Sequence, residues 1–305
     1  MGSRMDRSDR RFRRALALLG CSLLLAVPTS GCGEPGGRTA HEESGQWWVS
    51  RSGYPDSPAR ARQAPNPALR TAVRQADDYA DRLSGSTVAV AVLDRGSGAV
   101  VGGEHADDEF TTASVSKLFV ALDVVERRRE GLPVSSSDVE LIRRALALSD
   151  DGAMNELWDR FDGAGAISRV AVRYGLTRTL PPEVPGRWGD TRTSARDVAA
   201  VLARLPALPA AERALVLGPL DEAPRTAAEG FDQQYGLKAG ARRAAVKAGW
   251  MCCADGRRSV HSAGLIGPDR RYAVAVLSTQ PSSKSYSQAS EVVTEAAAPL
   301  LRHLG

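Results

Sequence analysis

Lysine is scarce in this chain. Of its 40 Lys and Arg residues only four are lysine, at positions 117, 238, 247 and 284. Arginine stays protonated near neutral pH, whereas a lysine that is withdrawn from water can give up its proton. A lysine kept in an arginine-rich sequence is therefore a candidate for proton transfer.

Histidine and cysteine are also scarce, which argues against a metal site. The four histidines lie far apart, and the four cysteines form no C-x-x-C pair. Protein metal sites need several such ligands at close spacing. We therefore expect no metal and no cofactor. Adjacent Cys252 and Cys253 either form a disulfide or are two small buried side chains, and the sequence leaves both alternatives open.

Positive charge is in excess only at the start of the chain. The net charge of +4 arises within residues 1–31, where six arginines outnumber two aspartates. The remainder is neutral, with 34 basic and 34 acidic residues, and indicates no basic surface for a polyanion. We expect no nucleic-acid partner, and we expect a monomer.

A membrane-spanning run is missing from the same region. The apolar run at 15–27 has 13 residues and follows an arginine-rich start, a pattern that is typical of an export signal and too short to span a bilayer. Thr29, Ser30 and Gly31 then precede Cys32, which resembles the lipobox of bacterial lipoproteins. A plain secretory signal that is cut near here is the alternative.

These features predict three segments. Residues 1–31 are a signal peptide, and residues 32–65, rich in Gly, Pro, Ser and Arg, form a flexible tether. Lipidation of Cys32 would anchor an exported protein to the cell membrane, facing outside the cytoplasm. Residues 66–305 form the folded domain.

The order of elements predicts an α+β fold for this domain. Patterns of β-branched residues predict strands at both ends of the domain, over 86–94, 99–103, 244–250, 257–267 and 271–279. Helical spacing predicts flanking helices over 68–83 and 286–304. We expect the strands to form one antiparallel five-stranded sheet, with an all-α lobe of about 112–230 inserted between them and a cleft beside it.

The segment TTASVSKLFVALDVV carries the first candidate for chemistry. Ser114 and Lys117 lie three residues apart, on one face of the helix that is predicted to begin here. Thr111 or Thr112 is the expected N-cap, which would place Ser114 near the positive end of the helix dipole. A neutral Lys117 amine can accept the serine proton. Alone the S-x-x-K motif is weak, because a helix can simply begin with polar residues.

Two further motifs follow in order. Ser149-Asp150-Asp151 lies between helical segments, and Lys247-Ala248-Gly249 lies on a predicted strand. With these motifs residues 66–304 resemble the class A β-lactamases and the penicillin-binding peptidases, which carry S-x-x-K, S-D-N and K-T-G in this order. The resemblance implies an extracytoplasmic serine hydrolase that forms an acyl-enzyme with a β-lactam or a cell-wall peptide.

The resemblance also implies a role for each matching position. Ser114 would be the nucleophile and Lys117 its proton partner. Ser149 would pass a proton to the leaving nitrogen, and Asp151 would orient Lys117 or the substrate amide. Lys247 would bind the substrate carboxylate and support Ser149. The backbone N–H groups of Ser114 and Trp250 would form an oxyanion hole, which Gly249 leaves accessible.

Four departures from the family pattern stand beside these matches. Asp151 replaces asparagine and would raise the pKa of Lys117, and Ala248 replaces threonine. A second K-A-G at 238–240 competes with 247–249, which we prefer because strand residues surround it. No deacylating Glu-x-x-Leu-Asn is present, and Glu183 is the only glutamate in that region.

The departures keep a second hypothesis open. The chain could be a lipid-anchored binding protein that retains the fold and has lost turnover. Other candidates have structural interpretations: His261 has no indicated partner acid, and Trp158 and Trp188 are expected to pack in the core or line the cleft.

Overall fold

The structure, a computed structural model, describes residues 66–240 and 244–305. The predicted signal peptide, Cys32 and the tether lie outside these residues. The described part begins with helix α1 (Pro67–Ala80), followed by strands β1 (Thr87–Asp94) and β2 (Ala99–Gly102). It ends with strands β5 (Ala245–Ala254), β6 (Arg257–Ile266) and β7 (Tyr272–Pro281) and helix α9 (Tyr286–Leu304).

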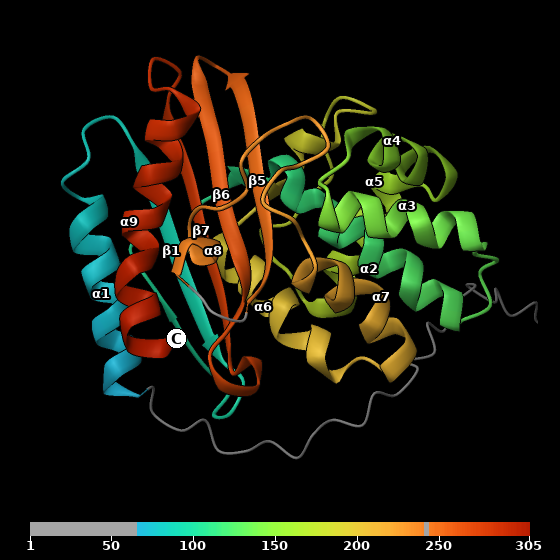
Figure 1. The fold of residues 1–305 in the computed structure, drawn as a ribbon, viewed down its shortest axis with the longest axis horizontal. Helices are drawn as coiled ribbons and strands as arrows, with labels where there is room; N and C mark the ends of the chain where they lie inside the picture. Colours follow the sequence, from blue (N-terminus) through green and yellow to red (C-terminus); the bar gives the residue numbers. More distant parts are fainter. Residues whose placement is uncertain (1–65, 241–243) are drawn as a thin grey trace, which may run out of the picture. The chain divides into compact units, whose positions relative to one another are not determined.

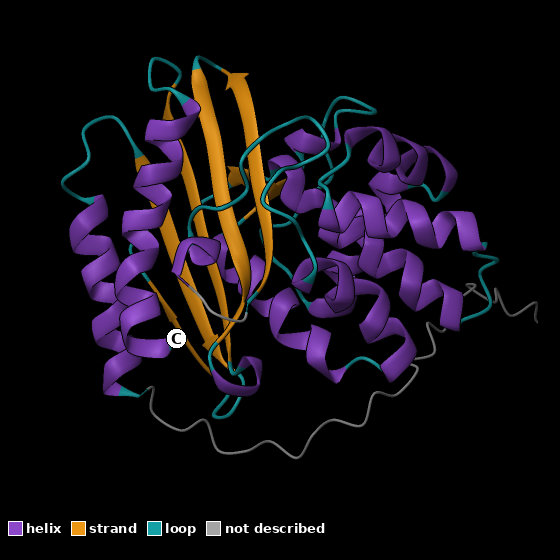
Figure 2. Cartoon of the chain, viewed as in Figure 1, coloured by secondary structure: helices purple, strands orange, loops and turns teal. Residues whose placement is uncertain are grey.

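The strands from both ends of the domain meet in one sheet, as predicted. Its order is β2-β1-β7-β6-β5, and all neighbouring strands are antiparallel. Helices α1 and α9 cover one face, and the helices of the middle of the chain lie on the other side (Figures 1 and 2). Strand β5 is the edge strand on the side of these helices. The predicted fold class is confirmed.

Alternating large and small side chains in the sheet determine how closely the helices on each face pack against it. In β1 the valines at 88, 90 and 92 pack toward α1 and α9, whereas the alanines at 89 and 91 pack toward the opposite core. Strand β7 repeats the pattern, with Val274 and Val276 against Ala273 and Ala275. Helix α6 (Ala195–Arg204) contacts both strands on the alanine side. Small side chains there let the helix lie close to the sheet.

The helices between the strands share one core with the alanine side of the sheet. Besides α6 they are α2 (Ser116–Arg129), α3 (Ser136–Ala147), α4 (Asp151–Arg160), α5 (Gly163–Tyr174) and α7 (Ala210–Asp221). The short α8 (Leu237–Gly240) contacts α9 and β6 instead. Helix α2 is buried along most of its length and packs against α5 and α7. The flanking helices predicted over 68–83 and 286–304 are present as α1 and α9, and the helix predicted after Ser114 is α2. The sequence patterns missed the two-residue ladder between β3 (Phe110–Thr111) and β4 (Arg192–Thr193), which is too short for a periodic signal.

Candidate active site

Ser114 lies in a short 3₁₀ turn, η1 (Ala113–Val115), that leads directly into α2. Ala113, just before the serine, has a φ of 46°, in the left-handed region that ordinarily favours glycine. Such backbone strain persists only where the surrounding structure holds it, and it is typical of functional sites. The turn therefore fixes the direction of the serine at the start of a buried helix.

The two threonines before this turn do not cap it with their side chains. The Thr111 hydroxyl is hydrogen-bonded to that of Ser259 on β6 at 2.8 Å, and Thr112 Oγ1 donates to the carbonyl of Gly189 at 3.4 Å. Thr112 does occupy the N-cap position of η1, as expected, but its side chain makes no capping hydrogen bond. The threonines instead tie the turn to the sheet and to the loop opposite, which are distant in sequence.

Lys117 lies at the centre of the site. Its side chain is fully buried, and its Nζ donates to Ser114 Oγ at 2.9 Å and to the Ser149 carbonyl at 2.6 Å. The same nitrogen lies 2.5 Å from Asp151 Oδ1 and 3.4 Å from Ser149 Oγ. The ring of Trp188 covers it, with its centre 4.6 Å away. The first two motifs thus meet at one amine.

Burial and Asp151 act on Lys117 in opposite directions. Burial disfavours the charged ammonium and is the largest influence, whereas the Asp151 carboxylate favours it. The net result is a lowered pKa of Lys117. The predicted upward effect of Asp151 is present, but desolvation outweighs it because the Asp151 side chain is 53% exposed and the lysine is not.

Ser149 joins the second motif to the third. It lies before α4 with a φ of 54°, fully buried. Its Oγ accepts a hydrogen bond from Lys247 Nζ at 2.8 Å, and Lys247 also donates to the Ala248 carbonyl at 2.8 Å. Burial, together with the nearby Lys117, lowers the pKa of Lys247 well below its ordinary value. Ser114, Lys117, Ser149 and Lys247 therefore form one connected cluster.

Gly249 allows β5 to approach the turn that holds Ser114. A Cβ at this position would lie 3.1 Å from Val115 Cγ2 and 3.2 Å from the Thr112 carbonyl oxygen, closer than side chains normally pack. The next residue, Trp250, stacks on Phe231 with ring centres 4.1 Å apart. Because β5 is an edge strand, alternate backbone N–H groups on its free side have no neighbouring strand.

His261 on β6 connects the sheet to the segment before Ser114. It is fully buried, its Nε2 lies 2.7 Å from the Thr111 carbonyl, and its Nδ1 accepts from the Ser278 N–H at 3.1 Å. Burial lowers the pKa of His261 to about 4, so Nε2 carries the proton and donates to Thr111. The histidine is structural, as the sequence indicated.

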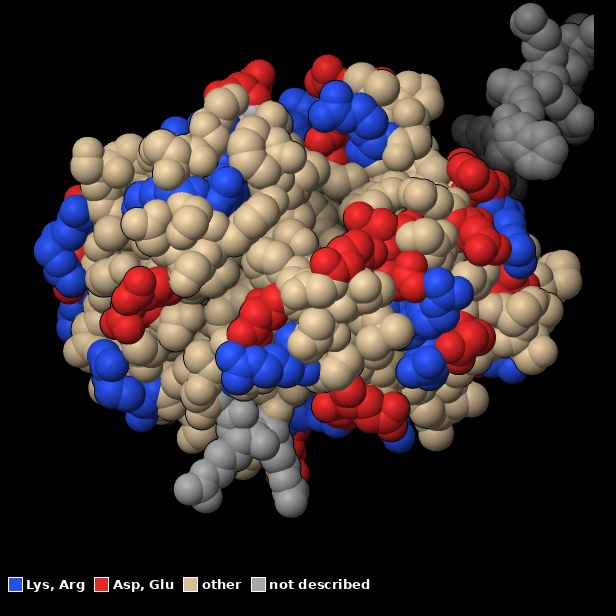
Figure 3. Space-filling view, turned by 45° about the horizontal axis from the view of Figure 1, so that its top comes forward, with Lys and Arg blue, Asp and Glu red and all other residues tan. Residues whose placement is uncertain are grey.

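A cavity of about 290 Å³ opens above Ser114. Besides Ser114 and Asp151, the residues that line it come from three loops and from β5. They are Ala113, Gly186, Arg187, Trp188, Gly189, Asp190, Glu229, Trp250 and Met251. Figure 3 shows acidic side chains gathered near the middle of the face that it draws, next to a hollow.

Sequence reasoning missed several of these lining residues. Arg187 and Asp190 form an ion pair at 2.6 Å, and the Trp188 indole donates to Asn155 Oδ1 at 2.8 Å. Glu229 accepts a hydrogen bond from the Asp151 N–H at 3.0 Å. Their loops have no periodic pattern, and Glu229 belongs to no motif. Trp188 was expected either in the core or at the cleft, and it lines the cavity.

Three other sequence candidates lie outside the cavity. Glu183 is 80% exposed and pairs with Arg192 at 3.1 Å. Lys238, in the competing K-A-G, lies in α8 and donates to the Ala223 carbonyl at 2.7 Å, so the strand motif is the one at 247–249. Trp158 is buried in the core of the helical region.

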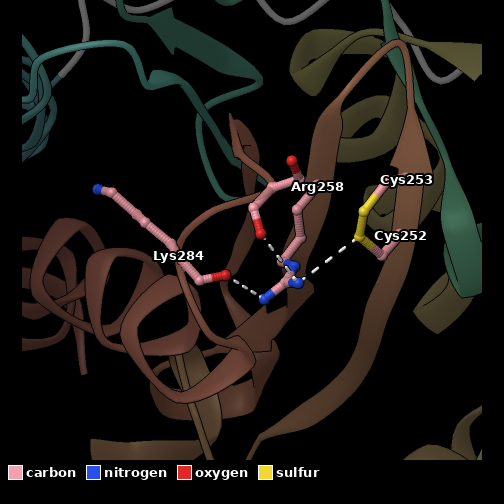
Figure 4. Close-up of a disulfide and its surroundings, with 5 residues drawn as sticks. Cys252, Cys253, Arg258 and Lys284 are labelled. Carbon is pink, nitrogen blue, oxygen red and sulfur yellow. Dashed lines mark hydrogen bonds between the residues drawn. A yellow bond between two sulfur atoms is a disulfide. The ribbon is translucent and has the colours of Figure 1, made fainter.

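Strand β5 continues past the cavity to Cys252 and Cys253. These cysteines form a disulfide and are exposed, so the alternative of two buried side chains is wrong. Arg258 on β6 lies beside them, with its Nη2 3.6 Å from Cys252 Sγ and its Nη1 bonded to the Lys284 carbonyl (Figure 4).

Neither a metal site nor a membrane span is found in residues 66–240 and 244–305. No cluster of three or more acidic, histidine or cysteine side chains there is arranged to hold an ion. None of the helices over the same residues combines the length and the apolar character that a bilayer crossing needs.

Relatives of known name match most of the chain. It is 37% identical over 242 residues to a protein described as "Putative lipoprotein LppW" in Mycobacterium tuberculosis and in Mycobacterium bovis, covering 77% of this chain and 76% of the relative.

Solved structures share the fold at lower identity. PBP-A is 19% identical, with a TM-score of 0.64 over 78% of this chain and 97% of its own. A class A beta-lactamase from Mycobacterium abscessus is 21% identical, with a TM-score of 0.60 over 76% of this chain and 98% of its own.

A match between the sequence and a protein-family model assigns the chain to a family. The model described as the beta-lactamase enzyme family matches residues 133–304, a range that includes Ser149 and Lys247 and begins after Ser114. This match covers more than half of the chain, and the mycobacterial relatives cover more than three quarters of it. The chain therefore belongs to the beta-lactamase enzyme family.

Proposed function

We propose that the protein is a serine hydrolase in which Ser114 forms an acyl-enzyme with a β-lactam or a cell-wall peptide. The observation that carries the proposal is the 2.9 Å contact between Ser114 Oγ and the buried Lys117 Nζ. A lysine with a lowered pKa is suited to accept a proton from a serine at this distance.

Lys117 is proposed to act in its neutral form. A neutral amine has two N–H groups, which would serve the Ser149 carbonyl and the Asp151 carboxylate. The third N–H, which otherwise points to Ser114 Oγ, would then be replaced by the lone pair that accepts the hydroxyl proton. Ser114 Oγ attacks the carbonyl carbon, and a tetrahedral oxyanion forms. We assign the oxyanion to the N–H groups of Ser114 and Trp250.

Ser149 is proposed to deliver the proton to the leaving atom. Its Oγ accepts from Lys247, with Lys117 further away, which leaves its own proton for the leaving nitrogen or oxygen. As the bond from carbonyl carbon to leaving atom breaks, the Ser149 proton moves to that atom. The proton that Lys117 took from Ser114 replaces it. Lys247 holds Ser149 in place.

Release of the acyl group needs a water molecule and a base. Glu183 lies outside the cavity, and no motif marks another deacylating glutamate. We therefore propose that the acyl-enzyme forms readily and is long-lived. PBP-A, whose fold this chain shares, has a variant that was solved as an acyl-enzyme complex with penicillin G; this likeness in fold is compatible with the proposal.

We test the proposal by intact-mass measurement after incubation with benzylpenicillin and with its methyl ester. The expected result is one added ligand mass in the wild-type domain and none in Ser114→Ala. A Ser168→Ala variant is a matched control, because this exposed serine lies on α5, outside the cavity. An adduct that persists in Ser114→Ala would remove Ser114 from its proposed role.

A non-catalytic binding protein is the second candidate. The replacement of threonine by Ala248 and the close Lys117–Asp151 pair favour it. Hydrolysis of a chromogenic cephalosporin that depends on Ser114 would exclude this candidate. Binding of the compound without an adduct would favour it.

We also propose the location and the domain boundaries. Residues 1–31 would be a signal peptide, Cys32 a lipidated residue, 32–65 a tether, and 66–305 the hydrolase domain with an α lobe of about 112–230. The likeness to mycobacterial proteins described as lipoproteins supports the membrane anchor. A Cys32→Ala variant that leaves the membrane fraction of the cell would test it.

A further inference from the structure

We infer that the cavity takes a substrate with no carboxylate beside its scissile bond, namely an amide or ester that is uncharged or cationic there. This inference rests on the proposed acylation of Ser114 and concerns which compounds reach it. Three observations carry it. The one basic side chain that lines the cavity already pairs with an acid, position 248 offers no hydroxyl, and Glu229 has no cationic partner in the described part of the chain.

Only one basic side chain lines the cavity among the described residues. It belongs to Arg187, which is 60% exposed and whose Nε pairs with Asp190 at 2.6 Å. Lys117 and Lys247 lie beneath the cavity, fully buried, and do not line it. A substrate carboxylate would therefore meet a single cation whose charge Asp190 already offsets.

Lys247, which the family resemblance assigned to the substrate carboxylate, is directed elsewhere. Its amine donates to Ser149 Oγ and to the Ala248 carbonyl, both at 2.8 Å, and its pKa is lowered by burial. Ala248 is buried in the core beside α1 and α9 and does not line the cavity, so position 248 offers no hydroxyl there. A carboxylate would therefore meet no hydroxyl donor from position 248, and the Lys247 amine is already engaged with Ser149 and Ala248.

The charge that remains at the cavity is negative. Asp151 Oδ1 lies 2.5 Å from Lys117 Nζ, and Asp190 Oδ2 lies 2.6 Å from Arg187 Nε. Glu229 also lines the cavity; it accepts from the Asp151 N–H at 3.0 Å and has no cationic partner within 4 Å in the described part of the chain. An anionic substrate is repelled by this carboxylate, and a cationic one is attracted. Glu229 is thus proposed as a specificity residue.

The test compares three forms of one chromogenic cephalosporin: the free acid, its methyl ester, and its 2-(trimethylammonio)ethyl ester. We expect the acylation rate constant of the methyl ester to exceed that of the acid by about tenfold, and the cationic ester to react at least as fast as the methyl ester. Because salt screens these charges, added salt should reduce the difference in acylation rate constant between the acid and the esters. A faster reaction of the free acid would overturn the inference.

Glu229→Gln, compared with Glu183→Gln, tests the residue. The first substitution should reduce the preference for the esters severalfold, and the second, in an exposed glutamate outside the cavity, should leave it unchanged. If Glu229→Gln instead prolongs the acyl-enzyme and leaves the preference intact, Glu229 activates water and the inference is wrong.

The outcomes also separate the inference from the proposed function. Acylation of Ser114 with preference for the free acid would leave the hydrolase proposal standing and remove the inference. If none of the three forms acylates the wild-type protein, the proposed function fails and the inference falls with it.

Discussion

The residues beneath the cavity and those at its rim differ in burial. The layer beneath, here called the floor, consists of Ser114, Lys117, Ser149 and Lys247, which are buried and connected by hydrogen bonds. The rim consists of Arg187, Asp190 and Glu229, which lie on loops and retain contact with solvent. Asp151 joins the two, because it binds Lys117 and is half exposed.

This difference in burial suits the floor and the rim to different roles. On the floor, burial lowers the pKa of both lysines and holds donors and acceptors at fixed distances, which is what proton transfer requires. On the rim, charges remain solvated and act over longer distances on what approaches. Substitutions in the floor should therefore alter the chemistry, and substitutions in the rim should alter selection with little effect on stability.

Lys117→Arg should have the largest effect. The substitution keeps a cation and removes the proton acceptor, so we expect the rate of Ser114 acylation to fall by about 10²–10⁴-fold. Stopped-flow measurement with a chromogenic cephalosporin ester would show it. Lys238→Arg, in the unused K-A-G, is the matched control and should react like the wild type. Equal rates in both variants would contradict the role of the floor.

The pH dependence of the same rate gives a second check on Lys117. Because its pKa is lowered, the neutral amine becomes populated at a lower pH than for an ordinary lysine. Acylation should therefore rise with pH and level off above the pKa of Lys117, below the usual value of 10.5. A rate that is independent of pH across this range would exclude Lys117 as the base.

His261 should have the next largest effect, on stability at acid pH. Its pKa falls from 6.5 in the unfolded chain to about 4 in the folded one, so the unfolded state binds the proton first. Its contribution is present above pH 6.5 and is lost as the pH falls toward 4, by about 3 kcal/mol. Urea unfolding at pH 7 and pH 4 would measure this loss.

Variants separate His261 from other groups in that experiment. His261→Gln should lack this acid-dependent loss, whereas His303→Gln, on an exposed residue of α9, should keep it. The Arg271 guanidinium lowers the pKa of Asp94 to about 2, so Asp94 contributes only at still lower pH. An unchanged pH dependence in His261→Gln would show that the floor does not depend on this buried histidine.

Gly249→Ala should have a smaller effect on both rate and stability. The new methyl group would press on Val115 and the Thr112 carbonyl and separate β5 from the nucleophile turn. We expect a loss of about 1–3 kcal/mol in the free energy of unfolding, with slower acylation. Gly218→Ala on α7, where a Cβ would meet nothing within 4 Å, should leave acylation unchanged. Wild-type acylation by Gly249→Ala would mean that this close approach is not needed.

Arg187→Gln should have the smallest effect on stability. Its ion pair with Asp190 is exposed, and such pairs contribute about 1 kcal/mol or less. The substitution frees Asp190, so the preference for uncharged or cationic esters should increase slightly while the melting temperature hardly changes. A large drop in the melting temperature of Arg187→Gln would contradict the description of the rim as a set of solvated charges.

The floor was predictable from the sequence, and the rim was not. Ser114 and Lys117, with Ser149 and Lys247, stand in short motifs at fixed spacing, and their spacing places them on elements whose periodic patterns are clear. Glu229 and Arg187 stand in loops, where position depends on contacts between distant segments. The same reason explains why Thr112 occupies the N-cap position of η1 without a side-chain cap, since its hydroxyl binds Gly189 instead.

Locating the adduct by peptide mass spectrometry, after treatment with the cephalosporin methyl ester, tests the central claim most directly. The account predicts a single acyl group on the peptide that contains Ser114, which Lys117→Arg nearly abolishes. An acyl group on any other residue, or one that forms at the wild-type rate in Lys117→Arg, would contradict the account.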